Sequence, residues 1–569
     1  MYINAKAKDE NTYDAIVIGS GISGGWAAKE LTEKGLKTLV LERGRNVEHV
    51  KDYVTAHQAP WELPYRDSTP PEELAEHYPK QSRTGYTIRP STKHWFVKDS
   101  EHPYGEVKRF DWMRGYHVGG RSIMWGRHSY RWSEQDFEAN AQDGFGVDWP
   151  IRYQDIEPWY TYVEGFAGIQ GQKEGLPQLP DGNFLPPIAM NCVEEHFRDK
   201  VAANLGGRVV TIGRTANLSV NHQGRTVCQY RNRCIRGCPY GSYFSSLSST
   251  LPAAVATGNM TLRPYSIVTS IIYDPEKKRA TGVKVVDQDT KEEMEFYAKV
   301  IFCCASAVAS TAILMNSKSD AFPNGLGNQS GELGHNLMDH HFRVGANGRF
   351  DGFNDKMEYG RRPTGFYIPR FRNVDQKSQQ KDYVRGYGYQ GGASRAGWSS
   401  SVAELGFGAD FKAGLMEPGP WQMGMTAFAE TLPYHENKMV LDYDNVDAWG
   451  QPTVVFDAEF KENEMKMRPD MANAAAEMLE AAGFKDVSTY DAGSWPGLGI
   501  HEMGTARMGR DPKTSVLNAN NQVHTVPNVY VTDGACMTSA SCVNPSLTYM
   551  ALTARAADHA VNELKKMNL

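Results

Sequence analysis

A glycine-rich turn between two apolar segments near the start of the chain constrains the fold more than any other feature. Residues 13–44 read YDAIVIGSGISGGWAAKELTEKGLKTLVLERG, which predicts a β-branched strand, a turn, an Ala- and Leu-rich helix and a second strand. Gly19, Gly21 and Gly24 form a G-x-G-x-x-G pattern directly after the first strand and at the start of the helix. In this context the pattern predicts a βαβ unit that binds a dinucleotide.

Each glycine of the turn is expected to have a different structural role. We expect Gly19 to permit the tight turn, Gly21 to let the backbone approach a pyrophosphate, and Gly24 to let helix and strand pack closely. Glu42 ends the second strand, where a carboxylate can accept hydrogen bonds from ribose hydroxyls. An acid at this position favours FAD or NAD over NADP.

Charge and hydropathy exclude several other classes of protein. The 61 Lys and Arg against 67 Asp and Glu give a net charge of −6, which argues against a general nucleic-acid binder. No run approaches the roughly 18 apolar residues of a membrane-spanning helix. The first fourteen residues lack the apolar core of a signal peptide, so we expect a cytoplasmic protein or one exported in a folded state with a partner that carries the signal. Sequence does not choose between these compartments.

Two elements are predicted near the C-terminus. The segment PNVYVTDGA, residues 527–535, predicts a strand followed by a turn at Asp533 and Gly534. The segment PSLTYMALTARAADHAV predicts a helix that begins near Asn544 and Pro545, since proline suits a first helical turn.

This C-terminal block, with IHEMGTARMG from residue 500, resembles the glucose-methanol-choline (GMC) oxidoreductase family. The resemblance also covers VGGRSIMWG at 118–126 and GHNLMDHH at 334–341, so three separated motifs follow the family's order. It implies an α/β fold: a discontinuous Rossmann-like FAD-binding domain at 1–345 and 491–569, and an α+β substrate domain with a large antiparallel sheet at 346–490. The cofactor contacts implied are Gly19, Gly21, Gly24, Glu42, Gly119, Gly120, Ser122, Asp533, Gly534, Asn544 and Pro545.

The resemblance also implies an active site. His501 lies in an H-x-x-G-T pattern at the family's catalytic histidine position, and Asn544 fills the second position. Oxidation of an alcohol removes a hydroxyl proton and a hydride, and an imidazole is suited to accepting the proton near neutral pH. We expect His501 to be the base, Asn544 to hold the substrate oxygen, and the flavin to accept the hydride.

The attachment of FAD is predicted from one position. Several relatives bind FAD covalently through a histidine four residues after their second glycine, and Met124 stands there in this chain. We therefore expect non-covalent FAD, although His117 and His128 lie near enough in sequence to leave a different linkage open.

Three of the eight cysteines are grouped with C-x5-C-x3-C spacing. Cys228, Cys234 and Cys238 lie in a Gly-, Arg- and Tyr-rich segment, and the last of them precedes a proline. This pattern favours an iron-sulfur cluster, with the neighbouring arginines stabilising thiolate charge. A zinc site that recruits His222, a disulfide, or unpaired thiols are the alternatives.

The loop at about 225–245 resembles the iron-sulfur loop of bacterial FAD-dependent sugar dehydrogenases within the same family, in which three cysteines hold a [3Fe-4S] cluster. The resemblance implies a dehydrogenase that passes electrons through the cluster to a cytochrome c, with a small companion subunit as a further partner. Among this group we favour oxidation of the C3 hydroxyl of glucosides and disaccharides to 3-keto sugars. Glucose 1-dehydrogenase, gluconate 2-dehydrogenase, an oxygen-dependent pyranose oxidase and a lyase of the same family remain alternatives.

Overall fold

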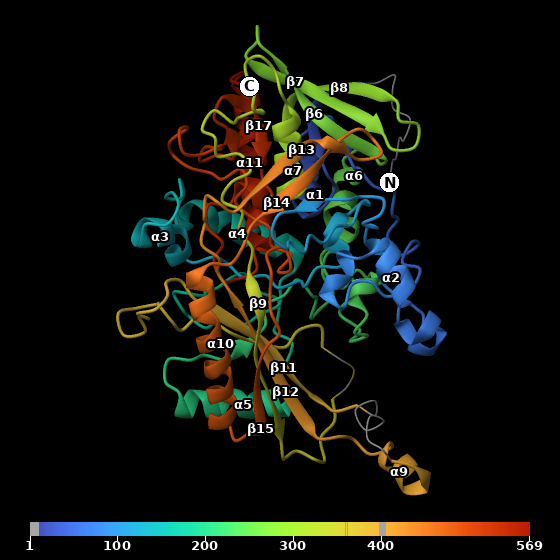
Figure 1. The fold of residues 1–569 in the computed structure, drawn as a ribbon, viewed down its shortest axis with the longest axis vertical. Coiled ribbons are helices and arrows are strands. Elements are labelled where there is room, and N and C mark those ends of the chain that lie inside the picture. The colour runs from blue at the N-terminus through green and yellow to red at the C-terminus, as the bar shows by residue number, and fades with distance from the viewer. Residues whose placement is uncertain (1–10, 359, 361, 398–405) are drawn as a thin grey trace.

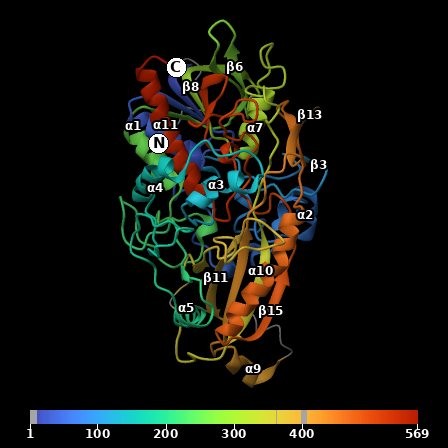
Figure 2. The same cartoon turned by 90° about the vertical axis from the view of Figure 1, so that its left-hand side faces the viewer.

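The computed structural model describes residues 11–358, 360, 362–397 and 406–569. The molecule is elongated, with a mainly parallel sheet towards one end and an antiparallel sheet towards the other (Figure 1). A view turned by 90° shows the same division along the long axis (Figure 2). No helix in the described ranges has the length and apolar character required to cross a membrane.

The first sheet has eight strands around the predicted βαβ unit. They are β1 (Thr12–Ile18), β2 (Thr38–Leu41), β5 (Met260–Arg263), β6 (Ser266–Asp274), β7 (Arg279–Asp287), β8 (Glu293–Cys303), β16 (Gln522–Val523) and β17 (Val526–Val531). The order β17-β8-β1-β2-β5 is parallel throughout. Strand β17 comes from the far C-terminus, so the FAD-type sheet is built from both ends of the chain, and its strands are buried on both faces as parallel strands require.

The described chain also forms the following α-helices: α1 (Ile22–Glu33), α2 (Pro71–His77), α3 (Glu134–Asp143), α4 (Tyr153–Ala167), α5 (Cys192–Asn204), α6 (Leu251–Ala256), α7 (Ala307–Asn316), α9 (Gly408–Gly414), α10 (Glu462–Ala481) and α11 (Ser546–Lys565). Helix α11 begins directly after Pro545, as the sequence predicts, and it packs against α1 and α4. Ala551, Ala554 and Ala557 are fully buried on α11, because small side chains allow helices to approach closely.

The second sheet has six antiparallel strands. In spatial order they are β15 (Lys485–Asp491), β9 (His341–Phe350), β12 (Trp421–Ala429), β11 (Tyr387–Arg395), β10 (Phe366–Ile368) and β4 (Thr211–Ile212). Helices α5 and α10 lie beside this sheet, and their apolar side chains share one core with it (Figure 2). The predicted α+β unit with a large antiparallel sheet is therefore present. The boundaries 1–345, 346–490 and 491–569 remain a proposal.

A smaller three-stranded sheet joins β3 (Gly105–Glu106) to β13 (Lys438–Val446) and β14 (Pro452–Asp457). Its core includes Phe456 stacked on Phe110 with ring centroids 3.9 Å apart. Through the contact of β13 with α7, this sheet closes one side of the central cavity.

Candidate active site

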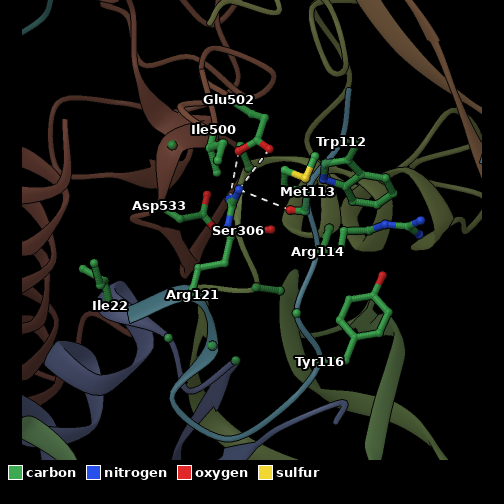
Figure 3. Close-up of a pocket in the computed structure, with 18 of the residues that line it drawn as sticks. Ile22, Trp112, Met113, Arg114, Tyr116, Arg121, Ser306, Ile500, Glu502 and Asp533 are labelled. Atoms are coloured by element: carbon green, nitrogen blue, oxygen red, sulfur yellow. Dashed lines mark hydrogen bonds and ion pairs between the residues drawn. The ribbon is translucent and has the colours of Figure 1, made fainter. Parts of the chain in front are cut away.

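A cavity of about 670 Å³ lies between the two large sheets. This volume falls within the roughly 300–1,000 Å³ of typical small-molecule and cofactor sites. Its walls come from the β1–α1 turn, segment 112–128, the start of α7, segment 498–502 and the start of α11. The two chain ends and the middle of the chain therefore meet at one site (Figure 3).

The glycine turn of β1 and α1 has the geometry predicted for it. Gly19 has a φ of +96°, and a Cβ built there would lie 2.6 Å from the carbonyl oxygen of Cys304. A Cβ on Gly24 would lie 1.9 Å from the carbonyl oxygen of Gly19, so Gly24 packs the helix on the strand and does not line the cavity. A Cβ on Gly21 would meet no atom within 4 Å, because Gly21 borders the cavity at the start of α1. The helix start and the open backbone at Gly21 together fit an anionic pyrophosphate.

Glu42 lies at the end of β2 and lines the cavity. Its carboxylate accepts a hydrogen bond of 2.6 Å from the Ser20 hydroxyl and one of 3.0 Å from the Gly44 N–H. Burial raises the pKa of Glu42, and the hydrogen bonds from Ser20 and Gly44 oppose that rise. The acid is therefore held in place beside the turn, where the ribose of a dinucleotide would lie.

Gly119 and Gly120 belong to a second glycine-rich loop that contacts this turn. Gly119 has a φ of +86° and donates its N–H to the Ser20 hydroxyl at 3.0 Å, but it does not itself line the cavity. Gly120 and Ser122 do line it. The Ser122 hydroxyl donates to the Gly119 carbonyl at 2.5 Å, so this side chain orders the loop.

Asp533 and Gly534 also line the cavity wall, whereas Pro545 does not. The Asp533 carboxylate accepts hydrogen bonds from the Ser310 hydroxyl at 2.5 Å and from the Ala535 N–H at 3.0 Å. Burial raises the pKa of Asp533 to about 6. The Tyr549 hydroxyl also lines the cavity and is buried without a hydrogen-bond partner from the chain. An unpartnered hydroxyl in a cavity wall, together with the open backbone at Gly21, fits a bound dinucleotide.

His501 and Asn544, predicted from distant motifs, lie next to each other in the cavity. Asn544 Nδ2 is 3.5 Å from His501 Nε2. On the other side of the ring, His501 Nδ1 is 2.8 Å from Nδ1 of His340. His340 Nε2 in turn lies 2.9 Å from the carbonyl oxygen of Ser541 and 3.2 Å from that of Ala540.

These contacts determine which nitrogen of His501 carries a proton. Carbonyl oxygens only accept, so His340 Nε2 must be the protonated nitrogen of that ring. Burial lowers the pKa of His340 to about 4, so the ring is neutral and its Nδ1 is an acceptor. His501 therefore donates from Nδ1. Burial, followed by the neighbouring His340 and Arg121, lowers the pKa of His501 well below its usual value, which leaves Nε2 as an unprotonated nitrogen facing Asn544.

Backbone contacts hold the segment that carries His501. The buried Asp339 carboxylate accepts the His501 N–H at 3.0 Å and the Gly499 N–H at 2.8 Å. Burial, with Glu502 nearby, raises the pKa of Asp339 to about 7. Asp339 and His340 both belong to the GHNLMDHH segment, for which the sequence analysis proposed no chemical role. An aspartate followed directly by two histidines in this motif was the signal that could have found them.

Arg121 and Glu502, which lie in two of the family motifs, form an ion pair that the motifs alone did not predict. The guanidinium donates to both carboxylate oxygens, at 2.8 and 3.1 Å, and also approaches the Met113 carbonyl (Figure 3). The pair joins the glycine loop at 118–126 to the H-x-x-G-T segment. It therefore places a cation in the cavity wall near His501.

The positions considered for FAD attachment are separated by the fold. Met124 and His128 line the cavity, but His117 is buried outside it. Burial lowers the pKa of His128 to about 3 and that of His117 to about 4, so both rings are neutral. Non-covalent FAD remains the proposal.

The three grouped cysteines surround a small separate cavity with Asn217, Tyr240 and Tyr243. None of the eight cysteines is in a disulfide, which rules out the disulfide alternative for this structure. Burial, and then the neighbouring Cys234 and Cys238, raise the pKa of Cys228 to about 11. Cys234 and Asn232 also line the main cavity, so the cysteine loop lies at its edge.

The side chains around the cysteine loop differ from the arrangement expected from the sequence. In the ranges that the structure describes, no group of three or more His, Cys, Asp or Glu side chains is placed to hold a metal ion. His222, the alternative zinc ligand, donates to the Gly165 carbonyl at 2.9 Å instead. Arg231 and Arg236 were expected to stabilise thiolates, but they donate to backbone carbonyls of Ala56 and Gln58 because these carbonyls lack helix or strand partners.

The fold and the cavity are those of a dinucleotide-binding protein, and His501 and Asn544 lie in the cavity wall. Family comparison identifies the group: models of the GMC oxidoreductase family match residues 13–342 and 433–553. The chain belongs to the GMC oxidoreductase family, as its motifs indicated. Membership of this family implies FAD as the cofactor.

Similar proteins cover nearly the whole chain. A 2-methyl-1,2-propanediol dehydrogenase of Mycolicibacterium austroafricanum is 28% identical, over 96% of this chain and 94% of its own. The fructose dehydrogenase large subunit of Gluconobacter japonicus is 26% identical, over 97% and 98%. Among solved structures, pyridoxine 4-oxidase from Mesorbium loti has a TM-score of 0.60 at 16% identity, over 96% and 98% of the two chains, which shows the fold alone. The enzyme is therefore a GMC oxidoreductase whose relatives act on alcohol CH–OH groups.

Proposed function

We propose that this chain is an FAD-dependent sugar dehydrogenase that oxidises the C3 hydroxyl of glucosides and disaccharides to 3-keto sugars. The observation that carries the proposal is the pair of His501 and Asn544 in the cavity, with an unprotonated Nε2 directed at the amide. A bare imidazole nitrogen is a base that can accept a hydroxyl proton at neutral pH.

FAD, when bound in the cavity, supplies the acceptor for the hydride that leaves the alcohol carbon. The chain's own residues provide the proton transfer and the positioning. His501 accepts the hydroxyl proton at Nε2, and Asn544 donates from Nδ2 to the substrate oxygen. Their separation of 3.5 Å is long for a hydrogen bond, so a substrate oxygen can take over both partners at little cost.

The cavity wall supports a polyhydroxylated substrate. The lining combines the amide of Gln390 and the imidazole of His128 with the rings of Phe342 and Phe428, whose centroids are 5.1 Å apart. Polar groups of this kind hydrogen-bond sugar hydroxyls, and aromatic rings pack on the apolar faces of sugar rings. Two relatives whose names include 2-methyl-1,2-propanediol and fructose dehydrogenase activity also support an alcohol with several hydroxyls.

The position of oxidation is tested by product analysis. The purified holoenzyme is mixed anaerobically with a disaccharide while the flavin absorption is followed, and the product is examined by NMR. Bleaching of the flavin with a ketone at C3 supports the proposal. A lactone from C1, or a ketone at C2, would assign the enzyme to a different sugar oxidation, and absence of bleaching by all alcohols would favour a lyase.

We further propose that electrons leave through a [3Fe-4S] cluster held by Cys228, Cys234 and Cys238. The three thiols border one cavity, and burial raises the pKa of Cys228, which is the condition that a positively charged iron core would reverse. Cys234 lines the main cavity as His501 does, so the loop and the site share one cavity. A cytochrome c would then receive the electrons, and a small companion subunit remains part of the proposal.

Iron and acid-labile sulfide analysis tests this second part independently. Three irons per chain support the cluster. Neither iron nor sulfide, with hydrogen peroxide formed in air, would favour an oxygen-dependent oxidase.

A further inference from the structure

Gln390, a residue of the antiparallel sheet, contacts the active site directly. Its Nε2 lies 2.7 Å from Asn544 Oδ1. Gln390 is on β11, where it pairs with Tyr367 of β10 and Thr426 of β12, and its side chain lines the main cavity. A central strand of the second sheet thus contributes to the placement of Asn544, which lies at the start of α11.

The direction of every hydrogen bond in this group follows from the two backbone carbonyls at residues 540 and 541. They require a donor at His340 Nε2, so His340 Nδ1 accepts from His501 Nδ1. His501 Nε2 is then an acceptor, and Asn544 must present its NH2 group to it. The amide oxygen of Asn544 therefore faces Gln390, which must donate from Nε2. Along the series Gln390, Asn544, His501 and His340, each residue therefore donates a hydrogen bond to the next, and His340 donates to the backbone carbonyls.

We infer that Gln390 is a positioning residue that fixes the amide of Asn544 with its NH2 group towards the reacting oxygen. The inference rests on the proposed function of His501 and Asn544. The side-chain amide of Asn544 has an oxygen that accepts hydrogen bonds and an NH2 group of similar size that donates them. A rotation of the amide by 180° would exchange the two groups. Gln390 stabilises the present orientation, because its NH2 group donates to the Asn544 oxygen and Asn544 could turn only if the amide of Gln390 turned as well.

The substitution Gln390→Glu replaces the donor at position 390 by an acceptor and leaves the size of the side chain nearly unchanged. An ionised carboxylate only accepts, so it would turn the Asn544 NH2 group towards residue 390 and the amide oxygen towards His501 Nε2. That oxygen stabilises a protonated Nε2 and raises the pKa of His501. Gln390→Met removes the donor without reversing the polarity and should therefore leave the pKa of His501 nearly unchanged.

The first test needs no substrate. The oxidised holoenzyme is labelled with 15N-histidine, and the His501 signals are assigned by their loss in His501→Ala. We expect the Nδ1–H tautomer in the unchanged protein and in Gln390→Met, but a ring protonated at Nε2 near neutral pH in Gln390→Glu. The same tautomer in all three proteins would overturn the inference, whatever the enzyme's substrate proves to be.

The second test measures the limiting rate of flavin reduction by a disaccharide. Gln390→Glu should lower it at least about tenfold near pH 7 and move its pH dependence upward. In an Asn544→Ala background the same substitution should have less than about a twofold effect, because Gln390 acts through Asn544. Equal losses in both backgrounds would indicate a direct effect of charge and would refute the positioning role.

A matched control makes the same chemical change elsewhere. Gln422→Glu introduces one negative charge at an exposed site on β12, outside the cavity wall. It should leave both the tautomer and the rate unchanged. If no sugar reduces the flavin of the unchanged enzyme, the proposed function fails, while the tautomer experiment still decides the role of Gln390.

Discussion

The active-site group and the cysteine loop are two reactive regions of one molecule with very different construction. His501, His340 and Asp339 are held by hydrogen bonds whose donors and acceptors are all assigned by the chain itself. The cysteine loop has little regular structure beyond a short 3-10 turn at Cys234–Arg236, and burial raises the pKa of its Cys228 thiol. The first region is organised by the polypeptide alone. The second has the character of a site whose charge balance depends on a bound group.

This difference separates two steps of the proposed reaction. The proton and hydride leave the substrate at the ordered group, whereas the electrons leave the protein at the loop. Changes in one region should therefore leave the step that belongs to the other region nearly intact.

The largest expected effect is that of His501→Ala on flavin reduction. Loss of a general base of this kind lowers a rate by about 10²–10⁴-fold, so anaerobic stopped-flow reduction by a disaccharide should slow by that factor. The glycine turn and Glu42 are untouched, and FAD content should stay the same. Rapid flavin reduction in the variant would show that His501 is not the base, and the proton-transfer step could then not be assigned to this region.

Cys234→Ser should have a large effect on a different step. We expect loss of iron and acid-labile sulfide and at least about a tenfold fall in electron transfer to cytochrome c, since serine is a poor ligand for iron. Flavin reduction should change less than about twofold. Cys192→Ser, at the start of α5 away from the loop, is the control. A variant that transfers electrons at the normal rate would show that the loop is not the exit.

The rate of flavin reduction should depend on pH moderately, and only on the acidic side of neutrality. Because burial depresses the pKa of His501 well below 6.5, the imidazole is neutral at pH 7 and remains so as the pH falls past 6.5. The limiting rate should stay level between pH 8 and 6.5 and fall only in more acidic solution, where His501 becomes protonated. A midpoint at or above 6.5, measured by stopped flow in a set of buffers, would contradict a buried neutral base.

The smallest expected effect is on stability. His340, His117 and His128 have pKa values of about 4, 4 and 3 in the folded protein. The unfolded chain binds more protons below pH 6.5, so their contribution is complete above that pH and is lost as the pH falls towards 4. Each contributes at most about 1.4 kcal/mol per pH unit in this window. Thermal unfolding at fixed FAD concentration should therefore show a lower midpoint at pH 5 than at pH 7. His128→Phe should weaken this dependence.

Local sequence predicted the parts of the site that depend on neighbouring residues. The turn with Gly19 and Gly24 was predictable because a Cβ at either position would meet backbone atoms close by in the same βαβ unit or its adjoining strand. The start of α11 after Pro545 was likewise predictable from helix chemistry. The pairing of His501 with Asn544 came from family resemblance, since 43 residues separate them.

The contacts that orient these residues could not be predicted in the same way. Gln390 lies 154 positions before Asn544, and His340 lies 161 before His501. Gln390 has no distinctive local sequence, and the GHNLMDHH motif around His340 does not indicate which residue His340 contacts. The same holds for the arginines of the cysteine loop, which were assigned to thiolates but bind carbonyls of segment 55–58.

The sequence by itself determined the class of cofactor fold, the position of the glycine turn and the chemical types available for catalysis, because these depend on backbone sterics and side-chain chemistry within short segments. Only the tertiary structure decided which nitrogen of His501 is bare and which face of Asn544 meets it. That choice depends on hydrogen-bond direction, and direction is set by acceptors that the fold brings from strands and loops far away in the chain.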